Sequence, residues 1–141
     1  MLWRERPLLE RINERMLGTA GEALGIVFTK VDDDSLEAQM PVDERTKQPA
    51  GLLHGGASVL LAETLGSVAS SLCAATAQHR CVGLEINANH VRGVTSGSVT
   101  GTVRALHVGR TTHVWDVRIV DPRGALVCVS RLTVAVLPPV D

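Results

Sequence analysis

Aromatic residues are almost absent from this chain. They make up 2% of its 141 residues, and there is no tyrosine. Proteins that hold single-stranded nucleic acid stack the bases on aromatic side chains, so this composition argues against such a function. The formal net charge of −1 gives no broad attraction to nucleic acid or to an anionic membrane surface. We therefore expect neither nucleic acid nor a membrane among its partners.

Cysteine is scarce, and its pattern suggests no structural role. The three cysteines, Cys73, Cys81 and Cys128, are odd in number and lack metal-ligand spacing, as is usual for reduced thiols in a cytosolic protein. The five histidines form no HxxxH or HxH cluster, so no metal is expected. The charged start at residues 1–6 lacks the apolar run of a signal peptide, and no charge-free apolar run reaches the roughly 18 residues of a membrane span. The sequence predicts a cytoplasmic protein.

What is present fits one α+β domain over residues 1–141, of ordinary composition with 45% hydrophobic residues. Helical spacing predicts an amphipathic helix over 7–19 that ends at Gly18, with a short connection over 21–25. A hairpin of two strands over 26–31 and 35–40 follows. After a long central helix, alternating apolar residues predict a meander of four strands over 80–92, 98–107, 110–120 and 125–137. The expected architecture is an antiparallel sheet curled round the central helix.

The central helix is predicted from residue 55 to about residue 77, and it carries a single acid. Glu63 is the only formally charged residue between His54 and His79, and apolar residues surround it on every side of the helix. Such a helix is expected to be buried, and a buried carboxylate loses hydration worth several kcal/mol unless something compensates. Glu63 is therefore either the working group of a site, or a structural residue that pairs with a buried arginine or caps a neighbouring element.

The start of this helix, His54-Gly55-Gly56, has little side-chain bulk where the first backbone N–H groups lack helical partners. Such donors, at the positive end of the helix dipole, suit an anion or a carbonyl oxygen that becomes an oxyanion. The two glycines would let a ligand approach the backbone closely, or would simply allow a tight turn into the helix.

Helix geometry then separates the donor from the acid. Gly55 and Glu63 are eight residues apart, so they lie about 12 Å apart along one helix. A carbonyl held at the Gly55 N–H cannot also touch Glu63 of the same chain. Two copies of the helix, antiparallel across a two-fold axis, would bring Gly55 of one to Glu63 of the other. This predicts an active site shared between subunits, two per dimer.

A known family carries the same residues. His54-Gly55-Gly56, followed by Glu63 and Ser67 and preceded by Gln48-Pro49, resembles the hotdog-fold acyl-CoA thioesterases. The resemblance is to the branch that acts on aromatic acyl-CoAs, which includes 4-hydroxybenzoyl-CoA and 1,4-dihydroxy-2-naphthoyl-CoA thioesterases, and it covers nearly the whole chain.

The resemblance implies catalytic roles for five residues. Glu63 would act as the nucleophile or as a general base on water. The Gly55 N–H, assisted by Gln48, would polarise the thioester carbonyl. Ser67 would orient the attacking water or the Glu63 carboxylate, and His54 would support the loop and contact the substrate.

The resemblance also implies how the substrate binds. An acyl-CoA would be the substrate rather than a cofactor, the catalytic unit would be a homodimer, and two dimers would form a tetramer. The substrate and its CoA arm would contact Gly56, Val82, Gly83, Asn89, His90 and Arg92. The sequence His90-Val91-Arg92-Gly93 differs from the family's usual His-His-Arg-Pro, which affects the expected contacts with the nucleotide of CoA.

The residues themselves agree with thioester hydrolysis, which needs a base or nucleophile and an oxyanion donor. Glu63 and Ser67, at i and i+4, share one helix face, and the Gly-x-Ser-x-Gly motif of serine hydrolases is absent. Two alternatives stay open. One is a hotdog acyl-thioester dehydratase or hydratase, which would place a histidine with the carboxylate. The other is a non-catalytic acyl-CoA-binding module in which Glu63 is structural.

Overall fold

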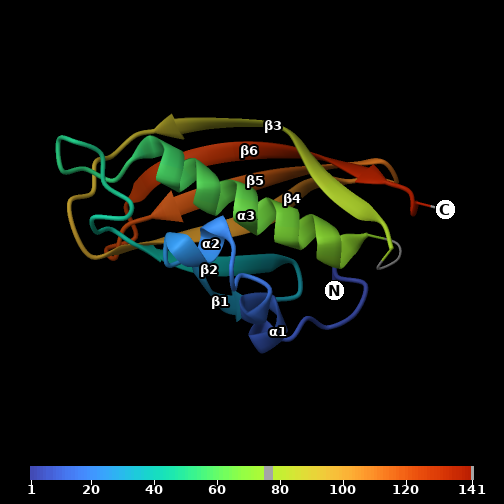
Figure 1. Ribbon diagram of the computed structural model, residues 1–141. Helices are drawn as coiled ribbons and strands as arrows, with labels where there is room; N and C mark the ends of the chain where they lie inside the picture. Colours follow the sequence, from blue (N-terminus) through green and yellow to red (C-terminus); the bar gives the residue numbers. More distant parts are fainter. Residues whose placement is uncertain (75–77, 141) are drawn as a thin grey trace.

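The computed structural model describes residues 1–74 and 78–140. Its helices are α1 (Leu9–Glu14), α2 (Ala20–Ala23) and α3 (Gly55–Cys73). Its strands are β1 (Val27–Val31), β2 (Ser35–Pro41), β3 (Arg80–His90), β4 (Ser98–Val108), β5 (Thr112–Val120) and β6 (Leu126–Leu137). The six strands form one antiparallel sheet that curls round α3 (Figure 1). The predicted α+β architecture is therefore confirmed.

The strand order, β1-β2-β4-β5-β6-β3, differs from the predicted meander of four strands. Only β4, β5 and β6 follow one another as a meander, while β3 pairs with β6 at the far edge of the sheet. The cause is the course of α3, which crosses the sheet and delivers the chain to the edge opposite β1 (Figure 1). β6 is thereby an interior strand, which explains its apolar residues on both faces. β3 is an edge strand on which Val82 and Leu84 are 48% and 64% exposed.

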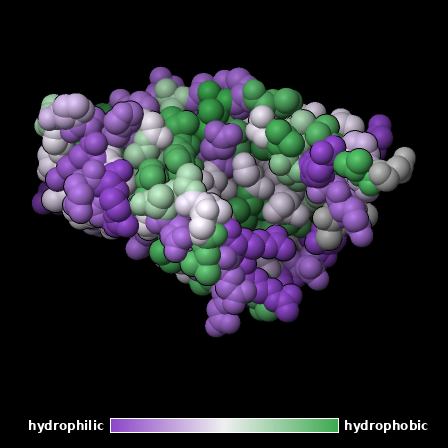
Figure 2. All heavy atoms as spheres, in the orientation of Figure 1, coloured by the Kyte–Doolittle hydropathy of each residue, from purple (hydrophilic) through white to green (hydrophobic). Residues whose placement is uncertain are grey.

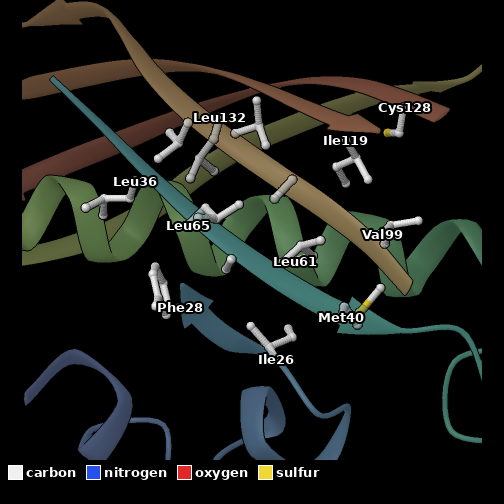
Figure 3. Packing of buried hydrophobic residues seen from close by; sticks show 14 of the residues in the cluster. Ile26, Phe28, Leu36, Met40, Leu61, Leu65, Val99, Ile119, Cys128 and Leu132 are labelled. Carbon is white, nitrogen blue, oxygen red and sulfur yellow. The ribbon is translucent and has the colours of Figure 1, made fainter. Parts of the chain in front are cut away.

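The core lies between α3 and the concave face of the sheet. Leu61 and Leu65, one helical turn apart, are fully buried and point toward the sheet (Figure 3). Two glycines permit this close approach. A Cβ on Gly66 would lie 2.5 Å from Leu132 Cδ2, and one on Gly101 would lie 2.7 Å from Leu65 Cδ1.

The central helix differs from the prediction at its end and on its outer face. It ends at Cys73, since Ala74 already has extended backbone with ψ 142°; residues 75–77 lie outside the described part of the chain. The expectation of burial on every side is wrong for the single chain, because the sheet covers only one face. Glu63 and Ser67, on the other face, are half-buried.

The N-terminal region also departs from the expected pattern in detail. The first helix is shorter than predicted, and Gly18 ends this region with a left-handed φ of 74°. The single turn α2 overlaps the expected connection over 21–25, and the Thr19 side chain accepts a hydrogen bond from the Gly21 N–H at its start. Of the described helices, α3 alone is long and apolar enough to cross a membrane, a test that the core helix of a soluble protein also passes.

Candidate active site

The start of α3 is capped by the histidine that precedes it. His54 has extended backbone, with φ −68° and ψ 129°, and its Nδ1 accepts a hydrogen bond of 2.8 Å from the Gly56 N–H. This bond requires a neutral Nδ1, so the ring proton of the neutral imidazole is on Nε2. The Gly55 N–H has no acceptor among residues 1–74 and 78–140. The ring of His90, at the end of β3, lies over Gly55: a Cβ added there would be 2.9 Å from His90 Nε2.

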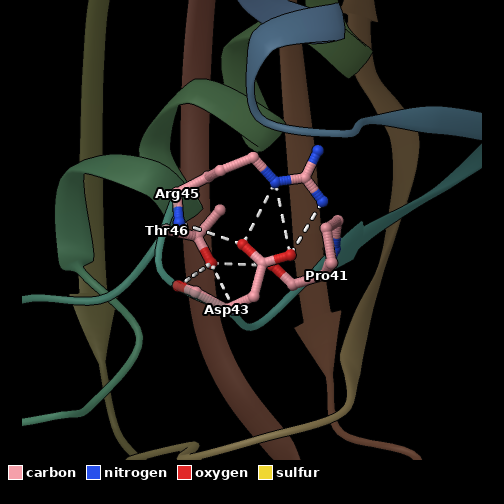
Figure 4. Close-up of polar contacts among 4 residues, drawn as sticks. All are labelled: Pro41, Asp43, Arg45 and Thr46. Carbon is pink, nitrogen blue, oxygen red and sulfur yellow. Dashed lines mark hydrogen bonds and ion pairs between the residues drawn. The ribbon is translucent and has the colours of Figure 1, made fainter.

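The loop that leads to this helix is held rigidly by polar contacts (Figure 4). Arg45 Nη2 lies 2.7 Å from Asp43 Oδ2, and this guanidinium holds the pKa of the Asp43 carboxyl below its usual value. Thr46 Oγ1 donates to the carbonyl of Pro41 at 2.8 Å and accepts from the Asp43 N–H at 3.1 Å. The Thr46 carbonyl in turn accepts from the His54 N–H at 2.8 Å. These bonds tie the end of β2 to the start of α3.

Gln48 lies in a tight turn of this loop. Its carbonyl accepts from the Gly51 N–H at 2.9 Å, and Gly51 takes the positive φ of 84° that closes the turn. The Gln48 side-chain oxygen accepts a short hydrogen bond from the Ala50 N–H. With its oxygen engaged in this way, the side chain presents its amide NH2 group as a donor.

Gln48 and Gly55 line one cavity of about 380 Å³, called here the donor cavity. Its lining residues are Gln48, Leu52, Leu53, Gly55, Ser58, His90, Val91, Arg92, Gly93 and Val127. The structure thus brings together four of the predicted site residues. Gln48 and Gly55 offer hydrogen-bond donors, His90 lies at the end of β3, and Arg92 lies in the segment after it. A substrate oxygen placed here would meet backbone and side-chain N–H groups.

Glu63 lines a different cavity, of about 290 Å³, called here the Glu63 cavity. Its lining residues are Met16, Thr19, Ala20, Gly21, Leu60, Glu63, Thr64, Ser67 and Val68. Glu63 and Ser67 are together, as their spacing predicts. The contributions of Met16 and of α2 were not foreseen, because helical spacing marks Met16 only as a core position.

The Glu63 carboxylate is free of partners within the described chain. No ion pair or hydrogen bond among the described residues includes it, which contradicts the alternative of a buried arginine partner in the same chain. Oε1 lies against the backbone of Gly83 on β3, where a Cβ would be only 2.6 Å away. Gly83 therefore gives the carboxylate room beside the edge strand.

The two cavities share no lining residue. Gly55 and Glu63 both lie on α3, so the eight-residue spacing keeps them about 12 Å apart in one chain. Val82 and Asn89 are exposed on β3, and Gly56 lies under the ring of His54. Within one chain, Gly55 and Glu63 therefore face different cavities.

The described residues contain no group of three or more histidine, cysteine, aspartate or glutamate side chains that could hold a metal ion. Independence from metals and cofactors stays a prediction. The cysteine thiols are also poorly suited to nucleophilic chemistry, since burial raises the pKa of Cys73 to about 12.

A sheet curled round one helix, with a glycine-rich helix start and a lone carboxylate two turns later, defines a thioesterase of the hotdog fold. Comparison with known proteins agrees: the chain belongs to the thioesterase superfamily, whose family model matches residues 50–128. It is an enzyme of that family, a thioester hydrolase.

Three relatives show how similar the chain is to known proteins in sequence and in structure. The 1,4-dihydroxy-2-naphthoyl-CoA hydrolase of Escherichia coli is 53% identical over 97% of this chain and 100% of its own length. A mutant of the thioesterase PA1618 from Pseudomonas aeruginosa superposes with a TM-score of 0.96 at 58% identity, over 98% of this chain and 99% of the other. Two mutant structures of the thioesterase SAV0944 from Staphylococcus aureus each superpose with a TM-score of 0.80 at 39% identity. One has alanine in place of a glutamine, and the other has alanine in place of a glutamate fifteen positions later. The glutamine mutant covers 84% of this chain and 98% of its own.

Proposed function

We propose that this enzyme hydrolyses acyl-CoA thioesters, with aromatic acyl groups preferred, in a site that two subunits share. The observation that carries the proposal is that Gly55 and Glu63, both on α3, line separate cavities. The free Gly55 N–H opens into one cavity and the unpartnered Glu63 carboxylate into another, with no residue in common. Neither half can process a thioester by itself, because the reacting carbon must be close to both an oxyanion donor and a base or nucleophile.

In the shared site, the thioester carbonyl oxygen accepts hydrogen bonds from the Gly55 N–H and the Gln48 amide of one subunit. Glu63 of the other subunit attacks the carbonyl carbon, or takes a proton from the water that does. Negative charge then develops on the oxygen, where the donors stabilise it. The carbon–sulfur bond breaks, and CoA leaves as a thiolate that takes up a proton. If water attacked directly, the acid product carries the oxygen of that water. If Glu63 attacked, an acyl–Glu63 anhydride forms, and water hydrolyses it in a second step that releases the acid and restores Glu63. Ser67, one turn after Glu63, orients the water or the carboxylate.

The edge strand offers a way to join two copies. β3 presents an unpaired strand edge and exposed apolar side chains at Val82 and Leu84, and exposed edges of this kind readily pair with another chain. Antiparallel pairing of two β3 strands about a two-fold axis would continue the sheet and set the two α3 helices side by side. A tetramer of two such dimers is the further assembly that we propose.

Two features of the relatives support the assigned residues and substrate. The Escherichia coli relative is by its name a hydrolase of an aromatic acyl-CoA, which supports an aromatic acyl group here. In SAV0944 the two mutated residues, a glutamine and a glutamate, are fifteen positions apart. Gln48 and Glu63 have the same interval, which supports their pairing as donor and acid.

The lining of the donor cavity, which includes His90 and Arg92, supports a position for the outer part of the CoA arm at this end of α3. We assign Gly56, Val82 and Gly83 to the path of the pantetheine, and Asn89, His90 and Arg92 to the outer part of CoA. The cationic Arg92 in the lining of the donor cavity suits a phosphate. The protein needs no cofactor under this proposal and acts in the cytoplasm.

The alternative chemistry, dehydration or hydration of an acyl thioester, needs a histidine beside the carboxylate. The lining of the Glu63 cavity contains no histidine, and the nearest candidates, His54 and His90, lie at the other end, around Gly55. Hydrolysis is therefore favoured. Release of a free thiol from benzoyl-CoA, rather than hydration of crotonyl-CoA, distinguishes the two.

Substitution of the acid tests the mechanism. Glu63→Gln keeps the size of the side chain and removes its charge, so we expect kcat for thiol release from benzoyl-CoA to fall at least ~10²-fold, the scale of lost acid–base assistance. Glu44→Gln, an exposed loop position, is the matched control and should leave kcat unchanged. Wild-type turnover in Glu63→Gln would refute the assignment, and tight binding without thiol release in the unaltered enzyme would indicate the acyl-CoA-binding module.

Mixing two inactive variants tests the sharing of the site. One chain carries Glu63→Gln and the other Gly55→Pro, which removes the backbone donor. Random exchange gives mixed dimers in half of the population, each with one intact site out of two, so activity should return to about a quarter of the wild-type value. Sites contained within single chains would give no recovery at all.

A further inference from the structure

A third cavity, of about 320 Å³, lies between the N-terminal segment, α1 and the last turns of α3, and it is called here the arginine cavity. Its lining residues are Arg4, Glu5, Arg6, Pro7, Leu8, Arg11, Ile12, Arg15, Met16, Val68, Ser71 and Leu72. Four of them are arginines and only one is an acid. The others supply a mostly aliphatic surface, so the cavity combines an apolar floor with a cationic rim.

The arginines of this rim are held in different ways. Arg4 is fixed, because its N–H donates to the carbonyl of Leu72 at 2.9 Å and its Nη1 donates to that of Ala74 at 3.1 Å. Arg11 on α1 and Arg15, the residue that caps the end of this helix, are exposed and form no ion pair within the described chain. In Figure 2, hydrophilic side chains cover the α1 region at the bottom of the view, below a more hydrophobic surface over α3.

The single acid of the rim does not neutralise it. The Glu5 side chain is 79% exposed, and its only ion pair among residues 1–74 and 78–140 is with Arg4, at 3.7 Å. The guanidinium groups of Arg6, Arg11 and Arg15 therefore have no carboxylate partner in this part of the chain.

The arginine cavity adjoins the Glu63 cavity. Met16 and Val68 line both. Along α3, Val68 lies about 7.5 Å beyond Glu63, and Leu72 about 13.5 Å beyond it. A group bound at the Glu63 carboxylate can thus continue over Val68 toward the arginines, while the donor cavity, with its own arginine, lies at the opposite end of α3.

We propose that the arginine cavity receives the far end of the acyl group, and that it selects acyl groups with an anionic oxygen substituent such as a carboxylate. The inference rests on the proposed function and narrows its substrate class. An aromatic ring would lie on the aliphatic floor next to Val68. A carboxylate beyond the ring would meet Arg11 and Arg15, whose guanidinium groups match it in charge and in hydrogen-bonding geometry.

The test compares two substrates of similar shape, 4-carboxybenzoyl-CoA and 4-methylbenzoyl-CoA, by thiol release. The wild-type enzyme should have the higher kcat/KM with the carboxylated substrate. Arg11→Gln and Arg15→Gln should each lower that kcat/KM by about three- to fivefold, the scale of an exposed ion pair, and leave the methyl substrate unaffected. Arg123→Gln, in the exposed turn between β5 and β6, is the matched control and should change neither.

Two results would overturn the inference while turnover is intact. One is that both variants keep the wild-type ratio of kcat/KM for the carboxylated substrate to kcat/KM for the methyl substrate. The other is an equal loss with both substrates, which would assign the arginines to the nucleotide of CoA. Failure of the proposed function looks different: the wild-type enzyme would release no thiol from either thioester. In that case, calorimetry gives the dissociation constants of the two thioesters for the wild type and for Arg11→Gln. An unchanged ratio of these constants, or an equal loss of affinity for both thioesters, would overturn the inference about the cavity.

Discussion

Gly55→Pro removes one backbone hydrogen-bond donor from the proposed oxyanion site. Gly55 is the first residue of α3, and proline is favoured at this position because its missing N–H has no helical partner there. The preceding residue must be extended before a proline, and His54 already is, with ψ 129°. The helix should therefore begin as it does in the wild type.

The expected magnitude follows from what the N–H does. It donates to no acceptor within the described chain, so its removal breaks no bond of the fold. Loss of one oxyanion donor costs about 10²–10³-fold in kcat, and the remaining Gln48 amide places the expected loss near ~10²-fold. The free energy of unfolding should stay within about 1 kcal/mol of the wild-type value.

The control is Gly55→Ala, which keeps the N–H but adds the same Cβ. That atom would lie 2.9 Å from His90 Nε2, so both variants displace the His90 ring. Their difference in kcat then reports the replacement of the N–H by the proline Cδ. Thiol release measures kcat, and urea denaturation measures stability. Equal kcat values for Gly55→Pro and Gly55→Ala, with both proteins folded, would refute the role of this N–H.

Two further predictions concern side chains next to the site and in the core. Gly83→Ala places a Cβ 2.6 Å from Glu63 Oε1, so the carboxylate must swing away. We expect kcat to fall about tenfold or more, while the free energy of unfolding changes by less than ~1 kcal/mol. An unaltered kcat would contradict the proposed position of the acid. Burial lowers the pKa of His113, whose Nδ1 has no partner in the described chain, so the unfolded state takes up a proton that the folded state does not as the pH falls below 6.5. The free energy of unfolding should drop there by up to about 1.4 kcal/mol per pH unit, and denaturation of His113→Gln between pH 5 and 7 should show a smaller slope than that of the wild type.

Local patterns predict much of the fold, because side-chain alternation and helical spacing are local properties. The hairpin of β1 and β2 and the extents of β4 and β5 follow from alternating residues such as Leu36, Ala38 and Met40. The neighbours of β3 do not follow, since alternation is the same whether a strand pairs with β4 or with β6. The path of α3 across the sheet decides that, and it depends on the whole core.

The candidate site divides in the same way. The separation of Gly55 from Glu63 follows from helix rise alone, and so does the meeting of Glu63 with Ser67. The position of Gln48 near Gly55 came only from the family resemblance, because a charged loop gives no local signal for it. The arginine cavity has no sequence signature at all: Arg4 and Arg11 meet the end of α3 only in the folded chain.

The edge position of β3 links the fold to the proposed chemistry. Had β3 joined a meander with β4, it would lie inside the sheet, and Gly83 would hold the Glu63 carboxylate away from any second chain. At the edge, the same glycine keeps the carboxylate beside a strand whose outer side has no partner strand in the described chain, and the exposed apolar residues Val82 and Leu84 favour association there. In the proposed dimer, the neighbouring chain supplies the donor that lies about 12 Å from the acid within one chain. Under this proposal catalysis requires association, so specific activity should fall when the enzyme is diluted below the dissociation constant of the dimer.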